Sequence, residues 1–166
     1  LTRHEYFNLN PSSGEGIAKH QLLINGEGIL PKTEQNVPDG SVKPVENTPF
    51  DLRELRFLEQ PLAQLEGGYD HNYVLEKYSK EVPAAVLAAP SGSPKMELYC
   101  TQPGIQFYSA NGIEKIENKT GTIQGPSPAL CLEPQFFPDT PNHPNFPSTV
   151  LKPEEQYKHT ITYKFL

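Results

Sequence analysis

The sequence predicts an all-β fold, a sandwich of antiparallel strands. Short apolar segments recur about every ten residues between turns rich in proline and glycine, which is the spacing of consecutive antiparallel strands. Proline accounts for 18 of the 166 residues, about twice its average usage, and interior prolines disfavour long helices. The end of the chain alternates apolar and polar residues with the period of two that is typical of a strand.

The first part of the chain shows few clear strands. Residues 17–24 alternate imperfectly and predict one strand, whereas residues 25–49 are punctuated by glycine and proline and predict loops. Residues 51–65 are the one plausible helical segment, because leucines recur three and four residues apart there. Pro61 should break that segment into short turns.

The rest of the chain predicts a succession of strands. The apolar run at residues 130–132 also has strand character. The clearest period of two lies at residues 157–165, with Tyr, His, Ile, Tyr and Phe on one face and Lys and Thr on the other. Between turns, further strands are expected at residues 69–75, 82–89, 95–101 and 105–109.

Length and charge restrict the possible functions. The 166 residues suit a single β-sandwich domain, residues 1–166. A net charge of −6 and no long basic run argue against a nucleic-acid partner. The chain has no apolar stretch of transmembrane length and no signal-peptide pattern, so we expect no membrane partner and a cytoplasmic location.

The cysteines and histidines predict no metal site. Cys100 and Cys131 both lie in apolar, strand-like segments, and two buried free thiols are favoured over a disulfide between them, which stays open. The five histidines show no metal-ligand spacing, and the chain has no Cys-x-x-Cys pair.

Glu133 is the strongest candidate for chemistry. It ends the apolar run Leu130-Cys131-Leu132, and a proline-rich loop at residues 137–147 follows closely. A carboxylate on a rigid, partly buried support has its pKa and its direction set by the surroundings, as proton transfer requires. The alternative is a charged residue that merely ends a strand.

Three other polar residues are candidates, each with a structural alternative. His4 lies among strand-forming residues and could be a structural histidine. Asp70 follows two glycines at the start of a strand and could satisfy local backbone donors. Gln106 lies between Ile105 and Phe107, where a satisfied core amide is an equal possibility. On one concave face among tyrosines and phenylalanines, these groups and Glu133 would suit a carbohydrate.

Several segments, in order, carry a specific resemblance. The chain resembles the C-terminal part of the aldose 1-epimerase (galactose mutarotase) family, whose fold is a large β-sandwich, or supersandwich. The matching segments are residues 1–9, 48–53, 68–73, 101–108, 131–135, 138–139, 145–147 and 151–165.

The resemblance implies an isomerase that interconverts the anomers of aldohexoses such as galactose and glucose, without metal or other cofactor. Glu133 would be the general base on the anomeric hydroxyl, and His4 the general acid on the ring oxygen. Asp70 and Gln106 would hold sugar hydroxyls, and Asp70 is also a hypothetical carboxylate partner for His4. The unperturbed pKa of glutamate, about 4.3, would keep Glu133 ionised at neutral pH.

The resemblance also implies an upstream portion that supplies an arginine and a second histidine, so we expect weak or no activity from residues 1–166 alone. Arg3 replaces the family's usual asparagine beside His4, and strand alternation predicts that it points away from that histidine.

Three other functions remain open at this point. A non-catalytic carbohydrate-binding module of the same fold would need neither the acid nor the base. A glycoside hydrolase would normally need two carboxylates, so that Asp70 would replace His4. A relative that acts on phosphorylated hexoses would need a basic pocket, which the spacing of Arg3, Arg53 and Arg56 does not indicate. The oligomeric state stays undetermined.

Overall fold

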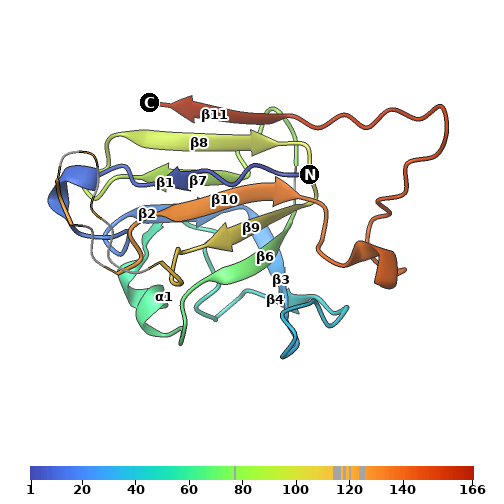
Figure 1. Ribbon diagram of the computed structural model, residues 1–166, viewed down its shortest axis with the longest axis horizontal. Helices are drawn as coiled ribbons and strands as arrows, with labels where there is room; N and C mark the ends of the chain where they lie inside the picture. The colour runs from blue at the N-terminus through green and yellow to red at the C-terminus, as the bar shows by residue number, and fades with distance from the viewer. Residues whose placement is uncertain (77, 114–116, 118, 120, 124–125) are drawn as a thin grey trace.

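The computed structural model describes residues 1–76, 78–113, 117, 119, 121–123 and 126–166. Two antiparallel β-sheets form the framework of this structure, and Figure 1 shows them layered one behind the other. The predicted all-β fold is therefore confirmed. No helix among the described residues is long and apolar enough to cross a membrane.

The first sheet has six strands in the order β1-β10-β9-β6-β3-β4. Each strand is antiparallel to its neighbours. The strands are β1 (Tyr6–Phe7), β3 (Gly26–Leu30), β4 (Lys43–Pro44), β6 (Asp70–Leu75), β9 (Gly104–Tyr108) and β10 (Leu130–Gln135).

The second sheet has five strands in the order β11-β8-β7-β2-β5 and is also antiparallel. Its strands are β2 (Gln21–Ile24), β5 (Arg56–Phe57), β7 (Ala85–Ala88), β8 (Lys95–Cys100) and β11 (Ile161–Phe165). The helical elements are short: η1 (Pro11–Ser13), α1 (Glu59–Ala63) and η2 (Thr140–Asn142).

The core lies between the two sheets. Leu22, Leu87 and Leu98 contribute from the second sheet, and Phe107 and Leu132 from the first, all fully buried. In a strand, residues two apart share a face, so these side chains leave their immediate neighbours on the opposite face of each sheet. On the first sheet, the neighbours of Phe107 and Leu132 are Gln106, Tyr108, Cys131 and Glu133.

Residues 48–51 are hydrogen-bonded to two tyrosines, Tyr69 just before β6 and Tyr73 within it. The Tyr69 hydroxyl donates to the Pro49 carbonyl at 2.5 Å, and the Tyr73 hydroxyl donates to the Phe50 carbonyl at 3.0 Å. The Phe50 ring also contacts the His71 ring, with centroids 4.6 Å apart. These contacts hold the strand that carries Asp70.

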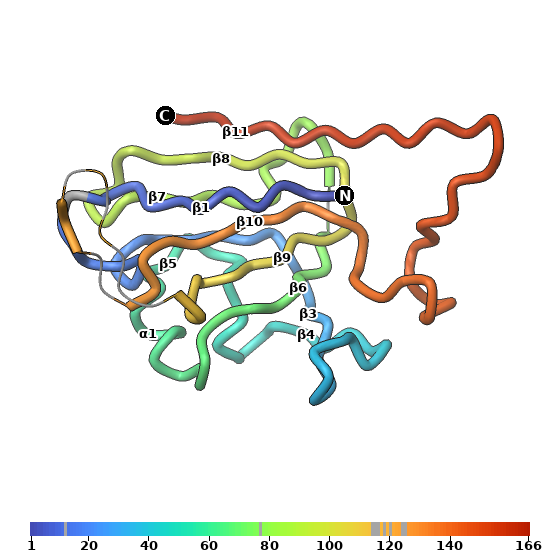
Figure 2. Tube along the Cα trace, viewed as in Figure 1, coloured from blue at the N-terminus to red at the C-terminus, as the bar shows by residue number. Residues whose placement is uncertain are grey.

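The local predictions were wrong in three places. β3 lies within the expected loop region, because its glycines and flanking turns hide a strand that pairs with β6. The leucine spacing of residues 51–65 yields only α1, while Arg56–Phe57 joins β2 as strand β5. The last strand begins at Ile161 rather than at 157, and residues 147–157 form part of an exposed arm that Figure 2 traces around one end of the molecule.

Candidate active site

The outer face of the first sheet brings the candidate residues together through strand register. Glu133 on β10 lies opposite Gln106 on β9, and Gln106 lies opposite Asn72 on β6. In the adjacent row, Cys131 lies opposite Tyr108, which lies opposite Asp70. Directly paired residues in neighbouring strands place their side chains on the same face.

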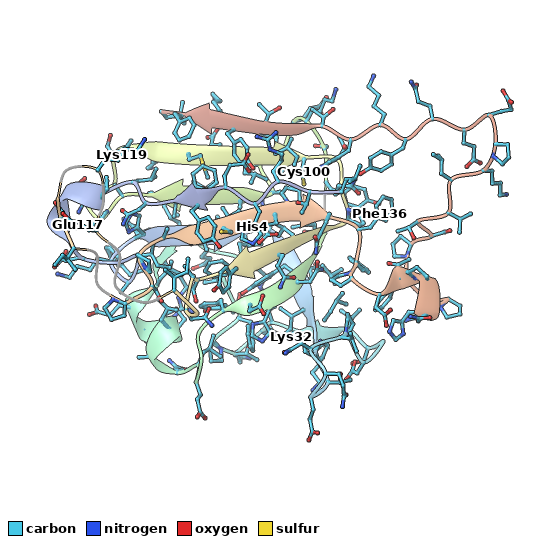
Figure 3. The ribbon with its side chains drawn as sticks, viewed as in Figure 1. His4, Lys32, Cys100, Glu117, Lys119 and Phe136 are labelled. Atoms are coloured by element: carbon cyan, nitrogen blue, oxygen red, sulfur yellow. The ribbon has the colours of Figure 1, made fainter. Side chains whose placement is uncertain are left out.

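His4 joins this face from the segment before β1. Tyr6 pairs with Cys131 in an antiparallel arrangement. His4, two residues before Tyr6, is therefore directed towards Glu133, two residues after Cys131. The His4 Nε2 atom lies 3.4 Å from an Oε1 oxygen of Glu133. The histidine side chain is half-exposed, whereas that of Glu133 is only 9% exposed. Figure 3 shows His4 over the face of β10.

Burial raises the pKa of Glu133 above its ordinary value. His4 opposes this effect, and the nearby Asp70 charge adds to it. The sequence-based expectation of an ordinary glutamate pKa therefore needs correction. A raised pKa makes Glu133 a stronger base once it is ionised, because the best general base has a pKa near the working pH.

Asp70 belongs to a second polar group on the same face. The Lys32 ammonium donates to its Oδ2 at 2.8 Å, and the Gln106 amide donates to its Oδ1 at 2.8 Å. Burial alone would raise the pKa of Asp70, but these two hydrogen bonds outweigh it and hold that pKa below its ordinary value. The carboxylate beside His4 is Glu133, so the hypothetical Asp70–His4 pairing is not what the geometry shows.

Aromatic rings line one side of the site. The His4 ring centroid lies 5.1 Å from that of Tyr6 and 6.3 Å from that of Tyr108. The two tyrosine rings meet edge to face at 6.5 Å. Such rings offer an apolar surface to the C–H bonds of a ligand, beside groups that hydrogen-bond its hydroxyls.

These groups surround an open hollow of about 470 Å³, a volume that suits a small molecule. The Oε1 atom of Gln106 is buried, and no hydrogen-bond partner reaches it in the part of the chain described. That oxygen could accept a hydrogen bond from a ligand only after the Gln106 side chain had moved. The hollow is lined by His4, Asp70, Gln106, Tyr108, Glu133, Gln135 and Pro138.

All four predicted site residues meet on this face, but sequence reasoning missed three neighbours. Lys32 lies in a segment expected to be loop, and Figure 3 shows it near the lower end of the same face. Tyr108 and Gln135 lie on this face through their pairing with Asp70 and Gly104. A period-of-two count from Glu133 and Gln106 would have found the last two.

Arg3 and the two cysteines behave as expected. Arg3 pairs with Glu5 at 2.5 Å, so its charge is directed to the carboxylate on its own side of the strand. Cys100 and Cys131 are both buried free thiols. Cys131 lies on the site face, where its sulfur, a His4 nitrogen and a Glu133 oxygen lie within 4.8 Å of one another, a grouping that the spacing of histidines and cysteines in the sequence did not predict.

An acid and a base this close fit a particular chemistry. When a carbon bears both a hydroxyl and an ether oxygen, breaking its bond to the ether oxygen requires one proton to be removed from the hydroxyl. Another proton must be supplied to the ether oxygen, a few ångströms away. Glu133 and His4 are positioned for such a paired transfer, and Asp70, Gln106 and Lys32 offer hydrogen bonds a short distance away.

Comparison with known proteins points to one family. The family model described as aldose 1-epimerase matches residues 1–164. Galactose mutarotase from Mus musculus is 40% identical over 168 residues, covering 99% of this chain and 49% of its own length. Aldose 1-epimerase from Escherichia coli (strain K12) is 32% identical over 175 residues, covering 100% of this chain and 50% of its own. The chain thus spans about half the length of the curated relatives it matches.

Solved structures agree on the fold. An aldose epimerase homologue from C. elegans superposes with a TM-score of 0.85 at 25% identity, covering 100% of this chain and 50% of its own. Galactose 1-epimerase from Lactobacillus acidophilus superposes with a TM-score of 0.78 at 24% identity, covering 100% of this chain and 48% of its own. The predicted mutarotase-like sandwich is confirmed.

Proposed function

This chain belongs to the aldose 1-epimerase family, and on that premise we propose that the protein is a mutarotase, an isomerase. It exchanges the α and β anomers of free aldohexoses such as galactose and glucose. The observation that carries the proposal is the 3.4 Å contact between His4 and Glu133. A hemiacetal carbon bears both the hydroxyl that must lose a proton and the ring oxygen that must gain one, so base and acid must lie side by side.

Each residue has a role in one round of ring opening and closure. Glu133 removes the proton from the anomeric hydroxyl, the bond from C1 to the ring oxygen breaks, and His4 protonates that oxygen. The open-chain aldehyde then rotates about its C1–C2 bond. His4 takes its proton back as the ring oxygen attacks the other face of C1, and Glu133 returns its proton to the carbonyl oxygen. The reaction is therefore balanced and regenerates both groups.

Asp70 and Gln106 are proposed to bind sugar hydroxyls that lie away from the reacting carbon. Asp70 is an anion that accepts hydrogen bonds from hydroxyls, and Gln106 lines the same hollow while its amide donates to Asp70. Tyr6 and Tyr108 would cover the apolar face of the ring. A binding module needs hydrogen bonds and an aromatic surface but no acid–base pair, which is why the mutarotase is favoured over that alternative.

Polarimetry of freshly dissolved α-D-galactose and α-D-glucose tests the function with the full-length protein. The protein should accelerate the change in rotation, and Glu133→Gln should lower that acceleration by about 10²–10⁴-fold, the usual contribution of a general base. Glu97→Gln is the matched control, because Glu97 lies on β8 in the other sheet. Folded protein that binds either sugar yet leaves the spontaneous rate unchanged would favour the binding module.

Two broader expectations stay predictions. Residues 1–166 are proposed to be one domain, part of an aldose 1-epimerase domain. A cytoplasmic location is also proposed, and cell fractionation with an antibody against the full-length protein would check it.

A further inference from the structure

We propose that His4, Cys131 and Glu133 form an inhibitory site for a thiophilic divalent cation, with Zn²⁺ as the ion that fits best. The inhibition part rests on the proposed function, because the ion would occupy the base and the acid. The ion-binding part rests on geometry alone. The ion would inhibit the reaction and would not take part in it, so the prediction that the reaction needs no metal is unchanged.

The three ligand atoms are already close together. One His4 nitrogen, the Cys131 sulfur and one Glu133 carboxylate oxygen lie within 4.8 Å of one another. The histidine and glutamate atoms are 3.4 Å apart. Ligand atoms bound at about 2.0–2.3 Å around a tetrahedral Zn²⁺ are separated by roughly 3.5 Å. Small side-chain rotations are therefore enough to complete the coordination.

Strand alternation explains why the thiol faces the site. Cys131 and Glu133 are two residues apart on β10, while Leu130 and Leu132 point into the core. Cys100, on β8, instead belongs to the core cluster between the sheets. The sequence could not reveal this ligand set, because one ligand lies 127 residues before the next.

The donor set selects the kind of ion. A thiolate and an imidazole favour Zn²⁺ and similar ions over Mg²⁺ and Ca²⁺, which prefer oxygen ligands. Binding replaces the S–H bond of Cys131 with a sulfur–metal bond and releases one proton to solvent. Three protein ligands leave the fourth tetrahedral position for water, as in open zinc sites.

The Cys131 thiol is fully buried next to His4 and Glu133, so an ion reaches it from the hollow only when neighbouring side chains move. His4 is exposed and Tyr6 is 48% exposed, so both side chains have room to move outward. Tyr6 pairs with Cys131 across β1 and β10, so its side chain lies next to the thiol and would move aside for the ion.

Co²⁺ provides a direct test on the full-length protein, because a cobalt–thiolate bond gives an intense near-ultraviolet charge-transfer band. We expect this band in the unsubstituted protein and in Cys100→Ser, its loss in Cys131→Ser, and its displacement by one equivalent of Zn²⁺. A protein without the band, or a band that persists in Cys131→Ser, would overturn the site. His4→Ala removes a ligand on an exposed side chain and should weaken Co²⁺ binding by about tenfold or more even if Cys131→Ser folds poorly.

Inhibition is measured separately by polarimetry in metal-free buffer with added Zn²⁺. Zn²⁺ should inhibit the unsubstituted protein and Cys100→Ser, and Cys131→Ser should raise the inhibitory concentration by about tenfold or more, when the rate of each variant is compared with its own metal-free rate. A cobalt band without inhibition by Zn²⁺ would overturn the inhibitory role. Absence of any mutarotase activity, with the cobalt band present, would instead contradict the proposed function and leave the metal site standing.

Discussion

At the scale of single residues, the two carboxylates on the site face have opposite electrostatic surroundings. Glu133 is buried and its pKa is raised, which suits a proton acceptor. The pKa of Asp70 is lowered by Lys32 and Gln106, so it remains an anion that holds hydroxyls. The two carboxylates thus serve different purposes, because their surroundings shift their pKa values in opposite directions.

Lys32→Met should weaken sugar binding more than it slows the reaction. Without the ammonium, the pKa of Asp70 should rise and its carboxylate should lose a positioning hydrogen bond. We expect KM to rise about two- to fivefold with kcat nearly unchanged, since a partly exposed ion pair contributes about 1 kcal/mol or less. Lys43→Met, on exposed β4, is the control. If Lys32→Met and the control had the same KM and kcat, Lys32 would have no part in sugar binding.

At the scale of elements, β6, β9 and β10 act as a unit whose register aligns the site. Between the outward-facing Asp70 and Asn72, His71 lies against the Phe50 ring, and its Nδ1 accepts a hydrogen bond from the Asp70 backbone N–H at 3.1 Å. Burial and the nearby Lys32 charge lower the pKa of His71 to about 4, despite the opposing effect of Asp70. The neutral imidazole is therefore part of what holds β6.

Stability should consequently fall in mild acid. Between the unfolded histidine pKa of about 6.5 and the folded value of about 4, the unfolded chain binds more protons. The contribution of His71 is thus complete above pH 6.5 and is lost as the pH falls towards 4, up to about 3 kcal/mol in all. His71→Asn keeps a hydrogen-bond acceptor without this titration. Urea unfolding between pH 4.5 and 7.5 should give it a shallower pH dependence; parallel curves would contradict the assignment.

At the scale of the whole molecule, the core and the site occupy opposite faces of the first sheet. Leu98 on β8 is fully buried in the core on the far layer. Leu98→Ala should lower the free energy of unfolding by about 2–5 kcal/mol, because a cavity remains. The rate per folded molecule and its pH profile should stay unchanged. Chemical denaturation and polarimetry on the same samples would check both; a changed pH profile would mean that the core determines the site electrostatics.

Local patterns determined most of the strands and the four candidate residues. Alternation over two residues and turns rich in proline and glycine are properties of short segments, so strands such as 70–75 and 104–108 were predictable. The leucine spacing before Pro61 was misleading, because pairing with β2 outweighs a weak helical preference at Arg56–Phe57.

Only the tertiary structure decided which residues meet. The contact of His4 with Glu133, the bond from Lys32 to Asp70 and the different surroundings of Cys100 and Cys131 depend on register between strands distant in sequence. A shift of one residue in that register would turn these side chains to the other face. Residue types and their periodicity are written in the sequence, but strand pairing and burial set their neighbours and their pKa values.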